Sequence, residues 1–223
     1  KNKQQTKVPI SLFGLKKDSV VSQYWFTGID SISQFNIPNN SEDKLVLNYD
    51  QKIPEFNQRD NWKSLNGWFS SNRKLKFQFF KDLEDPNYNQ VFYVPIVNFN
   101  IYDGLTPGIR LYNKTILERP FNYDFSPSYG LKGKKMVGYG RLNYRKYYNE
   151  KSLYVTNFSM GTSSYQYTEN ARYTTITPSF SMGWRPEDLR SNKKDYFNLR
   201  YVKVHRDPNP VNEMPIENQN PNY

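Results

Sequence analysis

Acid–base or metal chemistry in this chain would depend on its single histidine, His205. A zinc peptidase requires clustered histidine and carboxylate ligands, as in H-E-x-x-H on a helix. A serine hydrolase of the G-x-S-x-G type requires a nucleophile elbow. The sequence contains neither motif, and it has no cysteine that could act as a nucleophile. We therefore expect His205 to lie partly exposed at the end of a strand, without a catalytic partner.

Paired carboxylates are the second group that could do chemistry, because a glycosidase uses two of them as acid and base or nucleophile. Three acidic pairs occur: Glu42-Asp43, Glu84-Asp85 and Glu187-Asp188. All three adjoin turn residues, so we predict that they are solvated loop charges rather than catalytic pairs.

A glycine-rich segment could cradle a phosphate, and Gly130, Gly133, Gly138 and Gly140 lie close together. Their spacing matches neither G-x-x-x-x-G-K-[ST] nor G-x-G-x-x-G. We predict that they are turn and strand glycines. The sequence thus nominates no catalytic, cofactor-binding or metal-binding residue.

The composition points to strands. Aromatic residues make up 17% of the 223 residues, while mean hydropathy is −0.89. Aromatic residues favour β-structure, and no run approaches the ~20 apolar residues of a transmembrane helix. The net charge is +10, but the basic residues are mostly scattered and no recognised binding motif accompanies them, so we expect no nucleic-acid partner.

Residues 1–57 are predicted to form part of an immunoglobulin-like sandwich. Four short strands are expected at Val8–Leu15, Val20–Phe26, Ser31–Ile37 and Lys44–Leu47. This spacing is typical of such modules. A segment of this size is too small to form two complete sheets, so we expect further strands upstream. We interpret both ends of the chain as cut.

Residues 58–89 are predicted to be a linker leading into a second domain, with a polar connection near Asp60–Leu65 and a strand at Lys74–Phe80. Residues 90–223 show longer alternating segments, which we predict to be strands of an outer-membrane-type β-barrel. The expected strands are 91–102, 106–113, 121–129, 136–147, 153–162, 172–184 and about 195–205.

Alternation alone is also found in half-buried soluble sheets. Three further features favour a membrane barrel. Several strands reach the roughly 9–11 residues that cross a bilayer, the connections read as consecutive hairpins, and one face is rich in Ser, Thr, Asn and Tyr, as in a wet lumen. Phe121, Tyr129 and Trp184 lie near strand ends, where interfacial aromatics belong.

Fewer than the bacterial minimum of about 8 strands are expected here, so we predict an incomplete barrel. A soluble β-sandwich or a lipocalin-like barrel is the alternative.

Several sequence segments resemble the C-terminal portion of gluzincin (aminopeptidase N-like) metallopeptidases of Bacteroidota. Residues 44–50, 53–57 and 59–63, with 8–15 and 25–28, are similar to the small β-sandwich after the catalytic region. Residues 81–86, 93–96 and 102–111 resemble the start of the outer-membrane β-barrel that follows in large members.

The resemblance implies an all-β fragment that anchors or scaffolds a zinc metallopeptidase at the outer membrane, with its N-terminal module in the periplasm. Outer-membrane lipid and the upstream peptidase domain are the expected partners. The H-E-x-x-H motif is absent, so zinc is expected only upstream and no catalytic residue carries over. The alternative function is a soluble β-rich module that binds carbohydrate or peptide, and a self-contained enzyme is the third hypothesis.

Overall fold

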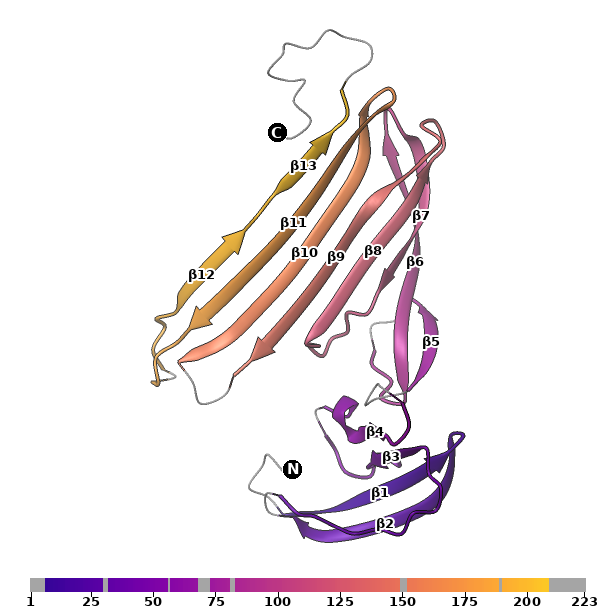
Figure 1. Ribbon diagram of the computed structural model, residues 1–223, viewed down its shortest axis with the longest axis vertical. Helices are drawn as coiled ribbons and strands as arrows, with labels where there is room; N and C mark the ends of the chain where they lie inside the picture. The colour runs from indigo at the N-terminus through magenta and orange to yellow at the C-terminus, as the bar shows by residue number, and fades with distance from the viewer. Residues whose placement is uncertain are drawn as a thin grey trace. The chain divides into compact units, whose positions relative to one another are not determined.

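The protein is all-β, as the sequence predicts. The computed structural model describes residues 7–29, 32–55, 57–67, 73–80, 83–148, 152–188 and 190–208. The chain divides into two compact units, Lys1–Leu75 with Asp85–Asn89, and Lys76–Glu84 with Gln90–Tyr223. Two sheets account for the described strands, one of four and one of nine strands (Figure 1).

The four-stranded sheet has the order β2-β1-β3-β4. Its strands are β1 (Val8–Lys16), β2 (Ser19–Ile29), β3 (Lys44–Leu47) and β4 (Trp62–Ser64). Alternate residues of β1 turn inward, and Leu15 is buried against Val46 and Trp62, with Tyr49 packed on this cluster. The Tyr49 and Trp62 rings meet edge to face with centroids 5.9 Å apart, a geometry that aromatic pairs favour.

Two expectations for this unit are wrong. Residues 32–37 of the predicted strand Ser31–Ile37 form no strand (residue 31 lies outside the described residues). Since β2 and β3 occupy both edges of β1, this segment instead stacks Phe35 on Phe26, with ring centroids 4.0 Å apart.

The expected polar connection near Asp60–Leu65 instead forms the 3₁₀ helix η1 (Arg59–Asn61) and β4, which pairs with β3. Burial of the Trp62 side chain explains why so polar a segment folds onto the sheet.

The nine-stranded sheet consists mainly of consecutive antiparallel hairpins, as predicted. From β6 to β12 each strand pairs with the next in sequence, which Figure 1 shows as long strands lying side by side. Its strands are β5 (Lys74–Phe79), β6 (Tyr88–Asn100), β7 (Gly104–Tyr112), β8 (Phe121–Gly130), β9 (Lys135–Tyr147), β10 (Leu153–Thr168), β11 (Ala171–Trp184), β12 (Asp195–Arg200) and β13 (Lys203–Arg206). Among the described residues the sheet is open, with β5 and β12 at the ends of its strand order.

The last predicted strand, about Asp195 to His205, is divided into β12 and β13, which both pair with β11. The break lies at residues 201–202, opposite Pro178. Tyr201 donates its backbone N–H to the Pro178 carbonyl at 3.1 Å, but proline has no N–H to donate in return. The loss of this ladder bond accounts for the interruption.

Connections at the two ends of this sheet differ in length. The turns 101–103, 131–134 and 169–170 form one end, and the longer connections 113–120, 148–152 and 185–194 form the other. β6 begins, at Tyr88, at the end with the longer connections.

Candidate functional site

His205 lies on β13 with an exposed side chain, as expected. Its Nε2 is 3.3 Å from Oδ1 of Asp207, and both side chains are in contact with solvent. Within the described ranges, no three His, Cys, Asp or Glu side chains come together as a metal site would require.

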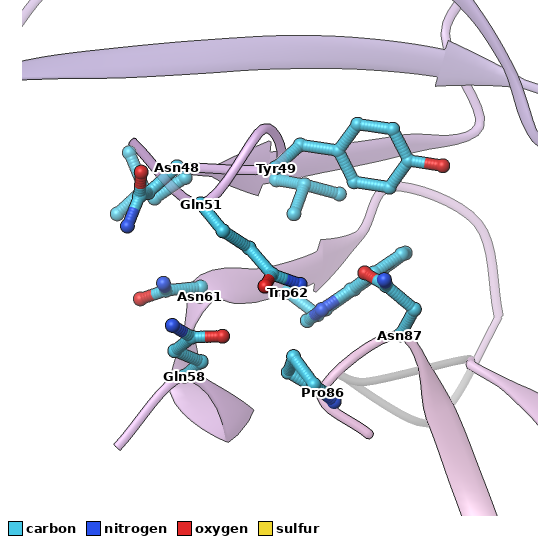
Figure 2. Close-up of a pocket in the computed structure, with 10 residues that line it drawn as sticks. Asn48, Tyr49, Gln51, Gln58, Asn61, Trp62, Pro86 and Asn87 are labelled. Carbon is cyan, nitrogen blue, oxygen red and sulfur yellow. The ribbon is translucent and has the colours of Figure 1, made fainter. Parts of the chain in front are cut away.

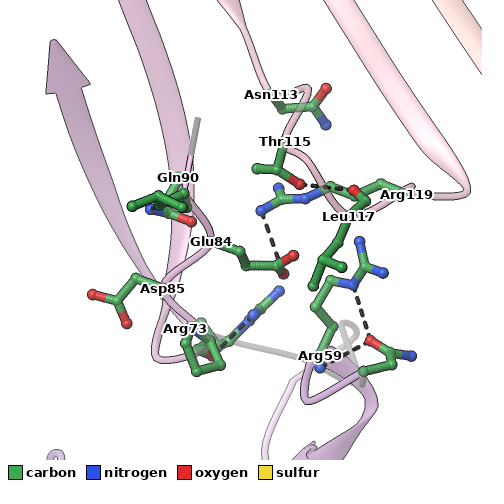
Figure 3. A network of polar contacts seen from close by, with 12 residues as sticks. Arg59, Arg73, Glu84, Asp85, Gln90, Asn113, Thr115, Leu117 and Arg119 are labelled. Atoms are coloured by element: carbon green, nitrogen blue, oxygen red, sulfur yellow. Dashed lines mark hydrogen bonds and ion pairs between the residues drawn. The ribbon is translucent and has the colours of Figure 1, made fainter. Parts of the chain in front are cut away.

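The predicted solvation of the acidic pairs is wrong for two residues. Glu42 is only 6% exposed, and its carboxylate accepts hydrogen bonds from Ser22 Oγ at 2.7 Å and the Asn40 N–H at 2.8 Å. Glu84 is also largely buried and lies 3.4 Å from the Arg119 guanidinium (Figure 3). The sequence did not reveal that Glu42 and Glu84 are buried, because the Ser22 and Arg119 side chains that contact them are distant along the chain. The remaining donor to Glu42 is a backbone N–H, which no residue type signals. Glu187 and Asp188 are exposed as expected.

The four glycines occupy turn and strand positions, as predicted. Gly140 lies opposite Phe125, and a Cβ atom on Gly140 would approach the Phe125 ring to 2.9 Å. Glycine is therefore needed there to accommodate the aromatic side chain, which agrees with its close-approach role in strands.

A small pocket in the first unit is too small for a substrate. It is lined by Asn48, Gln58, Trp62 and Asn87, among others (Figure 2), and its volume is about 10 Å³. Such a volume holds at most about one water molecule, whereas small-molecule sites are typically ~300–1,000 Å³.

One side of the nine-stranded sheet carries large apolar side chains that remain exposed. The pairing register places odd-numbered residues of β6–β8 and β12 and even-numbered residues of β9–β11 on this side. Phe99 is 70% exposed, and Leu199 is 60% exposed. We call this surface the apolar face. It comprises Tyr93, Pro95, Val97, Phe99, Leu105, Pro107, Ile109, Leu111, Phe121, Tyr123, Phe125, Pro127, Tyr129, Met136, Leu142, Tyr144, Phe158, Met160, Ile176, Pro178, Phe180, Met182, Trp184, Phe197 and Leu199.

An aromatic row crosses four neighbouring strands of the apolar face. Phe121 pairs with Tyr144, Tyr144 with Phe158, and Phe158 with Phe180. The predicted position of aromatics near strand ends is confirmed for Phe121 and Tyr129, the first and penultimate residues of β8, and for Trp184, the last residue of β11. Toward the short turns the same side becomes more polar on β10 and β11, where Ser164 pairs with Thr174.

The opposite side of β7–β12, which we call the polar face, carries mostly hydroxyl, amide and guanidinium groups. Ser159 and Ser179 hydroxyls are 2.7 Å apart across β10 and β11, and Ser163 and Thr175 are at the same separation. The expected placement of Arg141, Asn143 and Arg145 on one side of β9 is confirmed by their partners.

Two charged side chains of the polar face form a bidentate pair that sequence analysis did not identify. Arg110 Nε donates to Asp124 Oδ1 at 2.9 Å, and its Nη2 donates to Oδ2 at 2.5 Å. Fork-to-carboxylate geometry is among the stronger polar contacts available to proteins. Arg110 and Asp124 lie on adjacent predicted strands, which was the available signal for this ion pair. The sequence did not give the register between the two strands, and that register is what brings the side chains together.

The polar face is hollowed over β8–β12. The hollow measures about 630 Å³, within the range of ligand-binding cavities. Asp124, Arg141 and Arg200 contribute its charges, and Ser, Thr and Gly residues form much of the rest of its lining.

Within the part of the chain that the structure describes, no helix has the length and apolar content needed to cross a membrane. Comparisons with family models, curated proteins and solved structures found no match to this chain. The resemblance to gluzincin metallopeptidases therefore stays a prediction.

Proposed function

We propose that the nine-stranded sheet is part of the wall of an outer-membrane β-barrel and that it anchors or scaffolds an associated domain. The single observation that carries this proposal is the exposure of the apolar face, from Phe99 on β6 to Leu199 on β12. Soluble monomers rarely expose contiguous apolar patches beyond a few hundred Å². An apolar sheet surface of this extent suits contact with the hydrocarbon chains of membrane lipid.

The extent of the apolar face along the strands supports a lipid occupant. From Phe121 to Tyr129 of β8, the side chains on this face are Phe121, Tyr123, Phe125, Pro127 and Tyr129. This segment rises roughly 26 Å at about 3.3 Å per residue, or about 20 Å across a membrane at a strand tilt near 40°. That is comparable to the ~25 Å apolar band of outer-membrane barrels.

The contrast between the two sides of the sheet also supports the proposal. Membrane barrels alternate lipid-facing apolar residues with lumen-facing polar residues. Here Phe158 and Met160 lie on the apolar face, while Ser159 and Gly161, which alternate with them along β10, lie on the polar face. Closure by further strands would be required in lipid, because an open sheet edge leaves backbone groups unpaired there.

The associated domain proposed from the sequence resemblance is a zinc metallopeptidase of the gluzincin type, of bacterial and specifically Bacteroidota origin. Its active site would lie outside this chain, and the four-stranded unit would be a periplasmic module between the peptidase and the barrel. The residues of this chain then serve as anchor and scaffold. Sequence upstream of Lys1 containing H-E-x-x-H and a downstream Glu supports this assignment, and a different upstream domain overturns it while leaving the membrane proposal standing.

A soluble module that binds carbohydrate or peptide is the second candidate, favoured by the 630 Å³ hollow on the polar face. Membrane partition separates the two. The full chain is refolded from urea in plain buffer and in the presence of phosphatidylcholine vesicles, and the vesicles are then floated on a density gradient. We expect β-structure and flotation only with lipid or detergent. A monomeric, folded protein in plain buffer that stays at the bottom of the gradient overturns the membrane function.

A further inference from the structure

The hollow on the polar face contains two guanidinium groups that lack a carboxylate partner among the described residues. Arg141 on β9 and Arg200 on β12 both line it and are exposed. Unlike the Arg110 guanidinium, neither side chain is held in an ion pair with a described residue. An arginine without a carboxylate has five N–H donors available to a ligand in a fixed planar arrangement.

The acidic residue in the hollow does not neutralise these arginines. Asp124 faces Arg141 directly in the β8–β9 register, yet both of its carboxylate oxygens accept hydrogen bonds from Arg110. Its charge is thus already balanced. Among the charged residues that line the hollow, Arg141 and Arg200 therefore leave an excess of positive charge.

The floor between the two arginines is open and lined with hydroxyl groups. Arg141 pairs with Gly161, Gly161 with Thr177, and the neighbouring Ser179 pairs with Arg200. A Cβ atom on Gly161 would meet only the Thr177 carbonyl oxygen, 4.0 Å away. The two arginine backbones are separated by three strand spacings, roughly 14 Å across the sheet at ~4.8 Å per strand, and by a further offset of two residues along β11, from Thr177 to Ser179. Side chains of arginine length can reach inward over this floor from both sides.

We propose that this hollow is a binding site for an anionic solute, with Arg141 and Arg200 as its charged donors and Ser159, Ser163 and Thr175 as the surrounding hydroxyl groups. The ligand class is a carboxylate or phosphate compound, because guanidinium forks and hydroxyl groups match these oxyanions. The site faces away from the apolar face, so its existence does not depend on the membrane function. If that function holds, the site would lie in the lumen, where arginines favour anions.

Calorimetric titration of the full chain tests the site, using inorganic phosphate and succinate as probes and maltose as a neutral comparison. The chain is studied in an uncharged detergent or, if it folds there, in plain buffer. We expect saturable binding of phosphate or succinate, with the stronger of the two distinguishing a phosphate site from a carboxylate site. Arg141→Gln and Arg200→Gln should each weaken binding about tenfold, since each removes charge-assisted hydrogen bonds.

Two further variants separate the site from net charge and from misfolding. Arg190→Gln removes the same charge from an exposed connection outside the hollow and should leave binding unchanged. Gly161→Leu fills the floor without changing charge, at a strand position that accepts a β-compatible residue, and should also weaken binding. Absence of saturable anion binding, binding of maltose alone, or equal weakening by Arg190→Gln overturns the proposal. Far-UV circular dichroism confirms that each variant keeps its β-structure.

Discussion

Asp103, in the turn between β6 and β7, accepts a hydrogen bond from the backbone N–H of Gln166 near the end of β10, with 3.0 Å between Oδ2 and N. Both residues are almost fully buried. Asn100 donates its side-chain amide to the same carboxylate oxygen at 3.1 Å, and the Asp103 carbonyl accepts the N–H of Lys132 at 2.9 Å. One aspartate thus joins the ends of three hairpins that the chain forms far apart in sequence.

Replacing this aspartate should destabilise the nine-stranded sheet. Asp103→Ala leaves the buried Gln166 N–H without its acceptor, a loss of about 1–3 kcal/mol. It also removes one of the two acceptors of the Asn100 side-chain amide, which still donates to the Gln166 carbonyl at 2.8 Å. Urea unfolding in detergent micelles, followed by the electrophoretic mobility of unheated samples, measures the change. The control is Asp188→Ala in an exposed connection, which we expect to change stability by less than about 0.5 kcal/mol. Equal effects of the two substitutions would show that the buried contact contributes nothing specific.

A charge on the apolar face should oppose membrane insertion, whereas the same charge on the polar face should not. Met160 and Ser159 are neighbours on β10 that point to opposite sides. Met160→Arg is expected to cost about 2–4 kcal/mol at the bilayer midplane, while Ser159→Arg adds its charge to a polar surface. Equilibrium folding into phosphatidylcholine vesicles measures both variants. If Ser159→Arg were the more damaging substitution, the assignment of the two faces would be reversed.

The stability of the first unit should fall in acid through Glu42. The Ser22 hydroxyl, followed by backbone N–H groups, holds the pKa of the Glu42 carboxyl below its ordinary value of 4.5. A lowered folded-state pKa means that the ionised carboxylate stabilises the folded unit above pH ~4.5 and that this contribution is lost as the pH falls through the folded-state pKa. Hydrogen exchange of peptides from β1 and β3, recorded from pH 6 to pH 3 and corrected for intrinsic rates, follows this loss.

Glu42→Gln should flatten this acid dependence, because an amide does not titrate. Glu187→Gln, which changes an exposed carboxylate, should leave the profile as in the parent chain. The interpretation fails if the two variants give the same acid profile.

Single cysteines can determine which end of the sheet faces the cell exterior, since the chain has no cysteine of its own. A periplasmic N-terminal module requires the end where β6 begins to face the periplasm. Leu131→Cys in a short turn should then react with a membrane-impermeant maleimide on intact cells, and Asn192→Cys in a long connection should be protected. Known barrels usually have short periplasmic turns and longer outer loops. The reverse labelling pattern would follow that rule and would exclude the periplasmic module without affecting the membrane proposal.

Much of the nine-stranded sheet could be predicted because hairpin signals and alternation are local. The strands β8, β9 and β11 begin and end within one residue of their predicted positions. For example, β8 spans Phe121–Gly130, and the predicted strand was 121–129. Prediction failed where partners decide the outcome. Residues 32–37 alternate but form no strand, while Trp62–Ser64 lacks a period yet joins the first sheet. The tryptophan joins the sheet because the cluster of Leu15 and Val46 buries it.

The sequence by itself determined that this chain is all-β, that β6–β12 run in consecutive hairpins, and that each strand has an apolar and a polar side. These properties follow from side-chain period and turn chemistry, which act over a few residues. Only the tertiary structure decided that Arg110 forms an ion pair with Asp124 and that Arg141 and Arg200 line one hollow. It also decided that Asp103 accepts a hydrogen bond from Gln166. Such contacts depend on strand register and sheet curvature, which bring together residues that no local pattern relates.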